Sequence, residues 1–327
     1  MKKHKICKIL LVILAIFLCV AFYELLGICV AYKKQPEVSN TTKKETKNGS
    51  WNECSENTER AVIIEKNPEA LLQRVRLIKN AKKEIILSTF AFQSDESGKL
   101  ILGALHDAAD RGVHIRLLVD GMESWIDMEG NPYFYGLSSH ENVEIKLYNK
   151  ANPLKPWKMM GRMHDKYLIA DGKTYILGGR NTYNYFLGDF PGHKNYDRDV
   201  LVVCDEPEKE NSVNQLLEYF ETIWEQEDSG YFHDNKKLAN RKSVKNAVLE
   251  LQNGYQKYFE ENKERICDTD YTDETFETEK IALVSNPIHT GSKEPVVWYQ
   301  LGELMKNAKN RVKIHTPYII CNDMMYN

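Results

Sequence analysis

The pattern of apolar and polar positions divides the chain into a membrane-type segment and a folded body. A continuous apolar run covers residues 9–23 and, after Glu24, resumes as far as Tyr32. At a helical rise of about 1.5 Å per residue, this stretch is long enough to cross a bilayer. The body begins near residue 59 and alternates short β-branched runs with helical patterns. Such alternation predicts α/β layers in which helices pack on a sheet.

Periodicity places the expected elements of the body. Strand patterns, which are short runs rich in β-branched residues, occur at residues 61–65, 84–92, 114–121, 142–149, 163–170, 173–179 and 198–205. Helix patterns, in which apolar residues recur every three or four positions, occur at residues 68–83, 98–112, 211–226 and 244–259. The acidic residues 268–280 show neither pattern, and we expect them to be weakly ordered.

The end of the chain repeats an earlier part of it. Residues 304–319 align with residues 77–92 and share a leucine, the sequence Lys-Asn-Ala-Lys and a threonine. A helix-then-strand unit therefore begins twice. The predicted segments are a basic N-terminus, a transmembrane anchor, a polar linker, a complete unit, a connecting helical region and the incomplete start of a second unit, at residues 1–8, 9–32, 33–58, 59–228, 229–278 and 279–327.

Two features of the N-terminus bear on location. Because no small-x-small cleavage site follows the apolar core, we expect an uncleaved anchor rather than a cleaved signal peptide. Lysines flank the anchor at similar density on both sides, so the positive-inside rule leaves the orientation open. The predicted location is the membrane, on a side that the sequence does not decide.

Charge and cysteine content narrow the chemistry. The chain has 44 basic and 47 acidic side chains, for a formal charge of -3, so no global positive field marks a nucleic-acid binder. A local basic groove remains open as an alternative. The seven cysteines show no Cys-x-x-Cys or Cys/His spacing, which argues against a zinc site and a disulfide framework. We expect no metal and no cofactor.

Residues 163–181, MHDKYLIADGKTYILGGRN, carry the candidate chemistry. Strand alternation places His164 and Lys166 on one face, and Asp171-Gly172 is a two-residue hairpin signal. In the simplest register Ala170 lies opposite Lys173, Lys166 opposite Leu177 and His164 opposite Gly179, and Asn181 shares the histidine's face.

Such a face suits a phosphodiester. Lys166 and Asn181 can hold phosphate oxygens, an unprotonated His164 can attack phosphorus, and Gly179 leaves room for a ligand. Asp171 falls on the opposite face of the strand from His164 and Lys166 and lies in the turn. It is therefore expected to fix the hairpin or a neighbouring backbone group. The alternative is an ordinary half-exposed hairpin, but several residues at set spacings make coincidence improbable.

The motif resembles the signature of the phospholipase D superfamily, HxKxxxxD followed by six residues and GGxN, in the residues His164, Lys166, Asp171, Gly178, Gly179 and Asn181. The resemblance covers residues 59–228 and is greatest to bacterial cardiolipin synthases. It implies an α/β sandwich, with a mixed sheet flanked by helices, in two units whose motifs meet at one site. It also implies that His164, Lys166 and Asp171 are catalytic, that Lys166, Gly179 and Asn181 bind substrate phosphate, and that His164 forms a phosphohistidine.

The chain departs from that pattern in one respect: no second His-x-Lys pair occurs in it. The general acid would have to come from a second copy or another chain bearing the motif, as in single-motif nucleases of the superfamily. Residues 279–327 would occupy the surface where such a partner packs, so a shortened or interrupted reading frame is our expected explanation.

The sequence thus favours a membrane-anchored phosphatidyltransferase or phosphodiesterase of the cardiolipin synthase type. Its expected partners are phospholipid and the membrane, and nucleic acid is not expected. The alternatives are a dimeric endonuclease and a catalytically silent remnant. Trp157, Met159 and Met160, just before the motif, either shape a lipid-facing rim or simply pack.

Overall fold

The computed structural model describes residues 2–47, 59–204, 206, 211–233, 235–314 and 316. Contacts between Cα atoms divide the chain into two compact units. The first comprises Met1–Gln35, Cys54–Leu283 and Ile288–Ser292, and the second comprises Pro36–Glu53, Val284–Pro287 and Lys293–Asn327. The segment boundaries expected from the sequence remain predictions.

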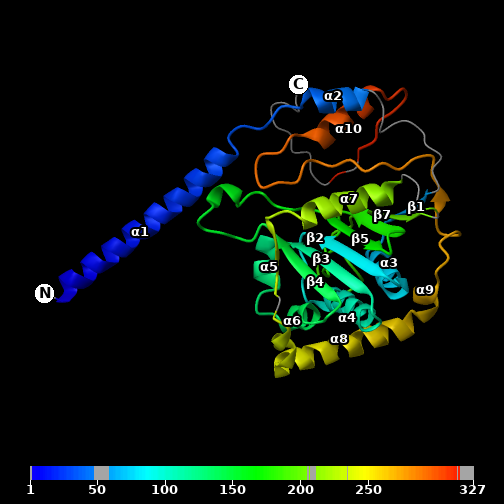
Figure 1. The fold of residues 1–327 in the computed structure, drawn as a ribbon, viewed down its shortest axis with the longest axis horizontal. Coiled ribbons are helices and arrows are strands. Elements are labelled where there is room, and N and C mark those ends of the chain that lie inside the picture. Colours follow the sequence, from blue (N-terminus) through cyan, green and yellow to red (C-terminus); the bar gives the residue numbers. More distant parts are fainter. Residues whose placement is uncertain are drawn as a thin grey trace. The chain divides into compact units, whose positions relative to one another are not determined.

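The described strands of the first unit form one mixed sheet of nine strands, in the order β8-β4-β3-β2-β5-β6-β7-β1-β9 (Figure 1). Their bounds are β1 Glu59–Ile64, β2 Glu84–Thr89, β3 His114–Asp120, β4 Val143–Tyr148, β5 Lys166–Ala170, β6 Thr174–Gly178, β7 Asp199–Cys204, β8 Ser229–Tyr231 and β9 Phe276–Glu277. The pairs β2–β3 and β3–β4 are parallel, and the other neighbours are antiparallel. The predicted α/β fold, a mixed sheet with helices, is confirmed.

Helices cover both faces of this sheet (Figure 1). One face packs against α3 (Asn67–Asn80), α4 (Glu96–Asp110) and α6 (Pro132–Ser138), and the other packs against α7 (Ser212–Trp224). Helix α8 (Lys242–Glu261) packs on the outer side of α4 and α6. The remaining helices are α1 (Lys2–Ala31), α2 (Asn40–Lys47), α5 (Gly121–Asp127), α9 (Lys263–Cys267), α10 (Val296–Lys306) and the 3-10 turns η1 (Pro156–Lys158) and η2 (Lys236–Asn240).

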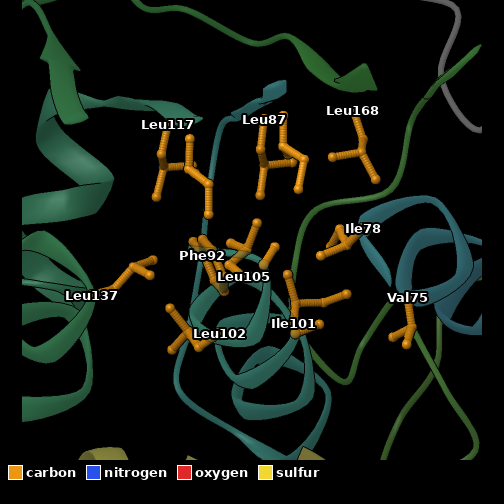
Figure 2. Packing of buried hydrophobic residues seen from close by; sticks show 14 of the residues in the cluster. Val75, Ile78, Leu87, Phe92, Ile101, Leu102, Leu105, Leu117, Leu137 and Leu168 are labelled. Carbon is orange, nitrogen blue, oxygen red and sulfur yellow. The ribbon is translucent and has the colours of Figure 1, made fainter. Parts of the chain in front are cut away.

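Strand alternation builds the larger core. Leu87, Leu117 and Leu168 project from β2, β3 and β5 toward the helical layer, where they meet α4 residues such as Ile101 and Leu105 (Figure 2). These five side chains are at most 4% exposed. Helices cover the central strands on both faces. This burial explains why the sequences of these strands are almost continuously apolar.

The expectation that residues 268–280 are weakly ordered is wrong. The buried Arg76 donates from Nε to the Asp268 carbonyl (2.8 Å) and from a terminal nitrogen to the Asp270 carbonyl (2.8 Å). Its guanidinium also lies 3.9 Å from the centre of the Tyr271 ring. The segment ends in β9, which pairs with β1. A long-range arginine thus orders a stretch that has no periodicity of its own.

Helix α2 lies within the predicted linker, which we expected to lack structure. Ser39 explains its start, since the Ser39 Oγ accepts from the Thr42 amide at 3.1 Å, as an N-capping side chain does. The rest of the linker, residues 48–58, lies outside the described residues.

The repeat at the end of the chain is described only in part. Helix α10 occupies the position of the repeated helix. The strand expected from residue 312 has no described counterpart, because residues 312–314 make no strand pairing and residues 315 and 317–327 lie outside the described part.

The motif hairpin forms with its strands one residue out of the predicted register. Asp171 and Gly172 have φ values of 54° and 62°, as a tight two-residue turn requires. The Lys173 amide donates to the Ala170 carbonyl at 3.0 Å and closes this turn. The strand pairing then places Thr174, not Lys173, opposite Ala170, so Lys173 stays in the turn.

This shift overturns the predicted cross-strand pairs. Leu177 lies opposite Tyr167 rather than Lys166. β5 begins at Lys166, so His164 precedes the strand and is not paired with Gly179. Since a one-residue slip moves every side chain to the other face, the single-face argument for the return strand is wrong.

Helix α1 contains the predicted span. Its Lys5–Ala31 stretch has 27 residues and a mean hydropathy of 2.9, and none of it is buried within the protein. It is long and apolar enough to cross a membrane, a test that an N-terminal signal sequence also passes.

The α4 core contact gives a stability prediction. Leu105→Ala should lower the free energy of unfolding by about 2–5 kcal/mol, because it leaves a cavity under the sheet. The matched control is Leu249→Ala on α8, where the leucine is 57% exposed and the change should stay within about 0.5 kcal/mol. Urea unfolding of the full chain in detergent, followed by tryptophan fluorescence, measures both. Equal midpoints for the two variants would contradict the packing described.

Candidate active site

Five strand ends meet at one edge of the sheet, and the motif begins there. β2 and β3 run parallel and end at Thr89 and Asp120. β5 runs antiparallel to β2 and begins at Lys166, opposite Thr89. β6 ends at Gly178, which lies opposite Asp199 at the start of β7. The topology therefore gathers groups from distant parts of the chain at this edge.

The Phe90 ring contacts both the histidine and the lysine of the motif. The Phe90 ring lies edge-on to the His164 ring, with centroids 4.6 Å apart. The Lys166 ammonium lies 5.2 Å from the centre of the same ring and donates to the His164 carbonyl at 2.6 Å. His164 is exposed, whereas Lys166 is only 5% exposed. The nucleophile candidate is thus accessible while the cation beside it is held in the protein.

Both groups have altered acidity. Loss of solvent, followed by the positive charge of Lys166, lowers the pKa of His164 below its ordinary value, although Asp120 opposes the shift. Burial lowers the pKa of Lys166 to about 8, against the opposing charges of Asp165, Asp197 and Asp120. At neutral pH the imidazole is therefore unprotonated, as a nucleophile must be, and most of the lysine remains charged.

A buried carboxylate fixes the backbone just before the histidine. Asp120, 1% exposed, accepts from the Arg162 Nε at 2.9 Å and from the Met163 amide at 3.1 Å. It also caps α5 by accepting from the Met122 amide at 3.0 Å. The position of His164 thus depends on a residue more than 40 positions earlier, which the motif did not reveal. Its sequence signal is an aspartate at the end of a strand directly before a helix.

The space beside Gly179 is filled by a second aspartate. A Cβ on Gly179 would lie 2.1 Å from the Asp197 Oδ2, and the Gly179 amide already donates to the Arg198 carbonyl at 3.3 Å. The expectation that this glycine leaves room for a ligand is therefore wrong. The missing side chain instead admits the carboxylate of Asp197 to the site, close enough to raise the pKa of Lys166.

Asn181 lies beside the segment that follows β2. Its side chain is 7% exposed, and its Oδ1 accepts from the Ala91 amide at 3.2 Å. With the oxygen engaged in this way, the Nδ2 group is the part of the amide that could donate to a phosphate oxygen.

Asp171 lies at the opposite edge of the sheet. Its carboxylate accepts from the backbone amides of Lys82, Lys83 and Glu84, at 2.8, 2.7 and 3.0 Å. Five residues of strand, about 3.3 Å each, separate it from Lys166. It therefore ties the hairpin turn to the start of β2, and a contact with the same phosphate as Lys166 is out of its reach.

Asp199 supports the site from inside the protein. Its fully buried carboxylate pairs with Arg74 at 2.9 Å and with Arg180 at 3.2 Å. Arg180, in turn, donates to the Ile64 and Glu65 carbonyls. This ion cluster fixes the start of β7, next to the end of β6.

The arrangement combines an accessible neutral imidazole, a desolvated ammonium and an amide donor at one edge. Such a set can bind an anionic phosphodiester and attack its phosphorus. Among the described residues, no group of three or more His, Cys, Asp or Glu side chains is placed to hold a metal ion.

Comparison with known proteins finds similarity in the part of the chain that contains this site. Residues 74–224 match the family described as cardiolipin synthase, PLD-like domain. Cardiolipin synthase C of Escherichia coli K12 is 29% identical over 171 residues, which are 48% of this chain and 34% of that protein. An uncharacterized protein of Helicobacter pylori J99 is 30% identical over 212 residues, 60% of this chain and 39% of that protein.

Among solved structures, a phosphatidylserine synthase of Haemophilus influenzae aligns with 68% of this chain and 48% of its own, at 17% identity and a TM-score of 0.45. The chain therefore spans between about a third and a half of the length of these relatives.

The hydrogen bonds of Asp171 predict that its loss destabilises the fold, whereas loss of His164 does not. Asp171→Ala should lower the free energy of unfolding by about 2–4 kcal/mol, because backbone amides lose a charged acceptor and alanine disfavours a positive φ. His164→Ala, at an exposed position, should change it by less than about 0.5 kcal/mol. Urea denaturation measures both. If Asp171→Ala proved as stable as the unmodified chain, the anchoring role would be excluded.

Proposed function

We propose that this chain, whose residues 74–224 form a phospholipase D-like domain of the cardiolipin synthase family, is a membrane-anchored enzyme that cleaves or transfers phosphatidyl groups. The observation that carries the proposal is the pairing of an exposed His164, with a lowered pKa, and a buried Lys166 beside it. Few other functions need a neutral imidazole next to a desolvated cation.

The proposed reaction has two steps. A ring nitrogen of His164 attacks phosphorus, forming a P–N bond while the P–O bond to the leaving alcohol breaks. An acceptor then attacks the phosphohistidine, breaking the P–N bond. Water as acceptor gives a phosphatidic acid, and the hydroxyl of a second phospholipid gives a transfer product such as cardiolipin. Lys166 and the Asn181 amide stabilise the charge that develops on the phosphate oxygens.

The leaving alcohol must also receive a proton. The 327 residues contain one His-x-Lys pair, so we assign this role to the His164 of a second copy of the chain, which gives its proton to the leaving alcohol in the first step and takes the proton of the acceptor in the second. Asp171 acts as a positioning residue, because its hydrogen bonds hold the turn at the far end of β5.

Helix α1 favours phospholipid over the alternative substrate, DNA. A span-length apolar helix would hold the site beside a bilayer, which a nuclease does not need. A dimeric endonuclease and a silent remnant remain the competing functions, and they differ from the proposal in what is turned over.

Turnover of lipid is the direct test. The full chain in phosphatidylglycerol proteoliposomes should produce phosphatidic acid or cardiolipin, detected by mass spectrometry. His164→Ala should lower the rate at least about a thousandfold, since the nucleophile is lost. The matched control is His114→Ala, a 45% exposed histidine at the start of β3 and so at the opposite edge of the sheet, which should keep the rate.

Other outcomes of this experiment would support the endonuclease or the silent remnant. Cleavage of DNA with no lipid product would establish the nuclease. Absence of any product, together with no phosphohistidine trapped on His164, would establish the silent remnant.

The pKa shifts of His164 and Lys166 predict a bell-shaped profile of kcat/KM against pH. The acid limb should lie below the ordinary histidine value of about 6.5, because His164 has a lowered pKa and stays unprotonated to lower pH. On the alkaline side the rate should fall as the general-acid histidine loses its proton and should fall further near pH 8, where Lys166 loses its charge. Because kcat/KM reports the free enzyme, bound phosphate does not shift these limbs.

Lys166→Arg isolates the part of the alkaline limb that is due to Lys166. A guanidinium stays protonated throughout this range, so the residual activity of the variant should show no further decline near pH 8. An unchanged alkaline limb in the variant would mean that another group titrates there.

A further inference from the structure

Large apolar side chains lie exposed beside the site. Trp125 and Ile126 on α5 are 68% and 67% exposed, and Leu154, Trp157 and Met160 in the loop after β4 are 78%, 45% and 56% exposed. We call these five residues the apolar rim. Burial normally stabilises such side chains, so a contiguous exposed group of them marks a contact surface.

The two segments of the rim are joined to each other. A Cβ on Gly121, at the start of α5, would lie 2.6 Å from the Lys150 backbone nitrogen, so helix and loop pack closely. Arg162 links them a second time, because it donates to both Asp120 and Glu123. The start of α5 and the loop are thus held together, in part by the same aspartate that positions the motif, and the exposed side chains of both lie at this end of the sheet.

The rim borders the active site. α5 follows the end of β3, and the loop crosses from the end of β4 to the start of β5, so both lie at the edge of the sheet where the motif begins. Met160 precedes His164 by only four residues. Whatever covers the rim is therefore brought next to the nucleophile.

The charges of the loop favour an anionic partner. Residues 150–164 contain no acidic residue and carry Lys150, Lys155, Lys158 and Arg162. Lys158 pairs with Asp228 at 2.7 Å and Arg162 pairs with Asp120 and Glu123, which leaves Lys150 and Lys155 as the cations that a partner can meet. Basic side chains around exposed tryptophan and leucine are the composition of segments that bind the surface of anionic membranes.

Contacts with α1 place the loop at membrane depth. The Tyr23 hydroxyl donates to the Leu154 carbonyl at 3.0 Å, and a Cβ on Gly27 would lie 2.5 Å from the Pro156 Cγ. A span of 27 residues is about 40 Å long, roughly the bilayer with its headgroups, and Tyr23 and Gly27 precede its last residue by about 12 and 6 Å, so they lie near the boundary between the hydrocarbon core and the headgroup layer. A loop that touches these residues lies near that boundary too.

We propose that the apolar rim inserts into the headgroup region of an anionic bilayer and holds the His164 site over the phosphodiester layer. The proposal rests on the proposed function, since it names the surface through which that site meets its lipid. The occupant is the bilayer in which α1 is anchored, and not a second protein.

Brominated lipids test the insertion without relying on activity. The full chain is reconstituted in phosphatidylglycerol vesicles with and without brominated phosphatidylcholine, and the contribution of one tryptophan is obtained by difference from its Phe variant. Bromine should quench the Trp125 and Trp157 contributions at least twofold. Trp224→Phe is the control, because that side chain is 4% exposed in the protein core and its contribution should not be quenched.

Unquenched Trp125 and Trp157 would overturn the proposal. If, in that case, crosslinking showed two copies joined through the loop, the rim would instead be an interface between chains. Helix α1 contains no tryptophan, so the anchor itself cannot produce the quenching.

A second variant connects the rim to turnover. Changing Leu154, Trp157 and Met160 together to Gln should lower the rate on phosphatidylglycerol in vesicles at least fivefold and leave the rate on monomeric dihexanoyl-phosphatidylglycerol unchanged. Leu249→Gln, an exposed leucine on α8, is the matched control and should change neither rate. Equal rates on vesicles for the triple variant and the unmodified chain would contradict the proposal. Quenching without turnover of either lipid would remove the proposed function and leave the rim in place.

Discussion

The buried carboxylate of Asp120 is the interaction on which both the site and the apolar rim depend. It ends β3, caps α5, and holds Arg162 and Met163 by hydrogen bonds. Charge-assisted hydrogen bonds of this kind are strong, and the desolvated acceptor makes each donor costly to lose. One group therefore sets the path of the chain into His164 and the position of the helix that carries two of the five rim residues.

Burial of the Lys166 ammonium is unfavourable, and nearby carboxylates offset part of this cost. A lysine that is 5% exposed lacks most of its hydration, and its pKa falls to about 8 as a result. The charges of the Asp165, Asp197 and Asp120 carboxylates limit this shift. An anionic phosphate beside this ammonium would stabilise its charged form, so the burial that lowers the pKa of Lys166 also favours binding of an anion.

The local sequence pattern predicted most of the helices and strands but not the contacts between them. The 3.6-residue spacing of Leu71, Val75 and Ile78 predicts α3 because all three side chains face one core. The hairpin register was missed because Lys173 stays in the turn and Thr174 lies opposite Ala170. Asp197 beside Gly179, and Arg76 holding residues 268–271, depend on packing between distant segments. Sequence spacing carries no signal for such contacts.

The order of the strands limits how a second histidine could reach the site. The loop and α5 lie over the ends of β4, β3 and β2 on one side of His164, and β6, β7 and β1 end on the other. If the bilayer covers the first side, a second copy must approach over the second, where Asp197 and the start of β7 line the edge. In the proposed reaction, lipid and partner would then reach His164 from opposite sides and would not compete for the same surface.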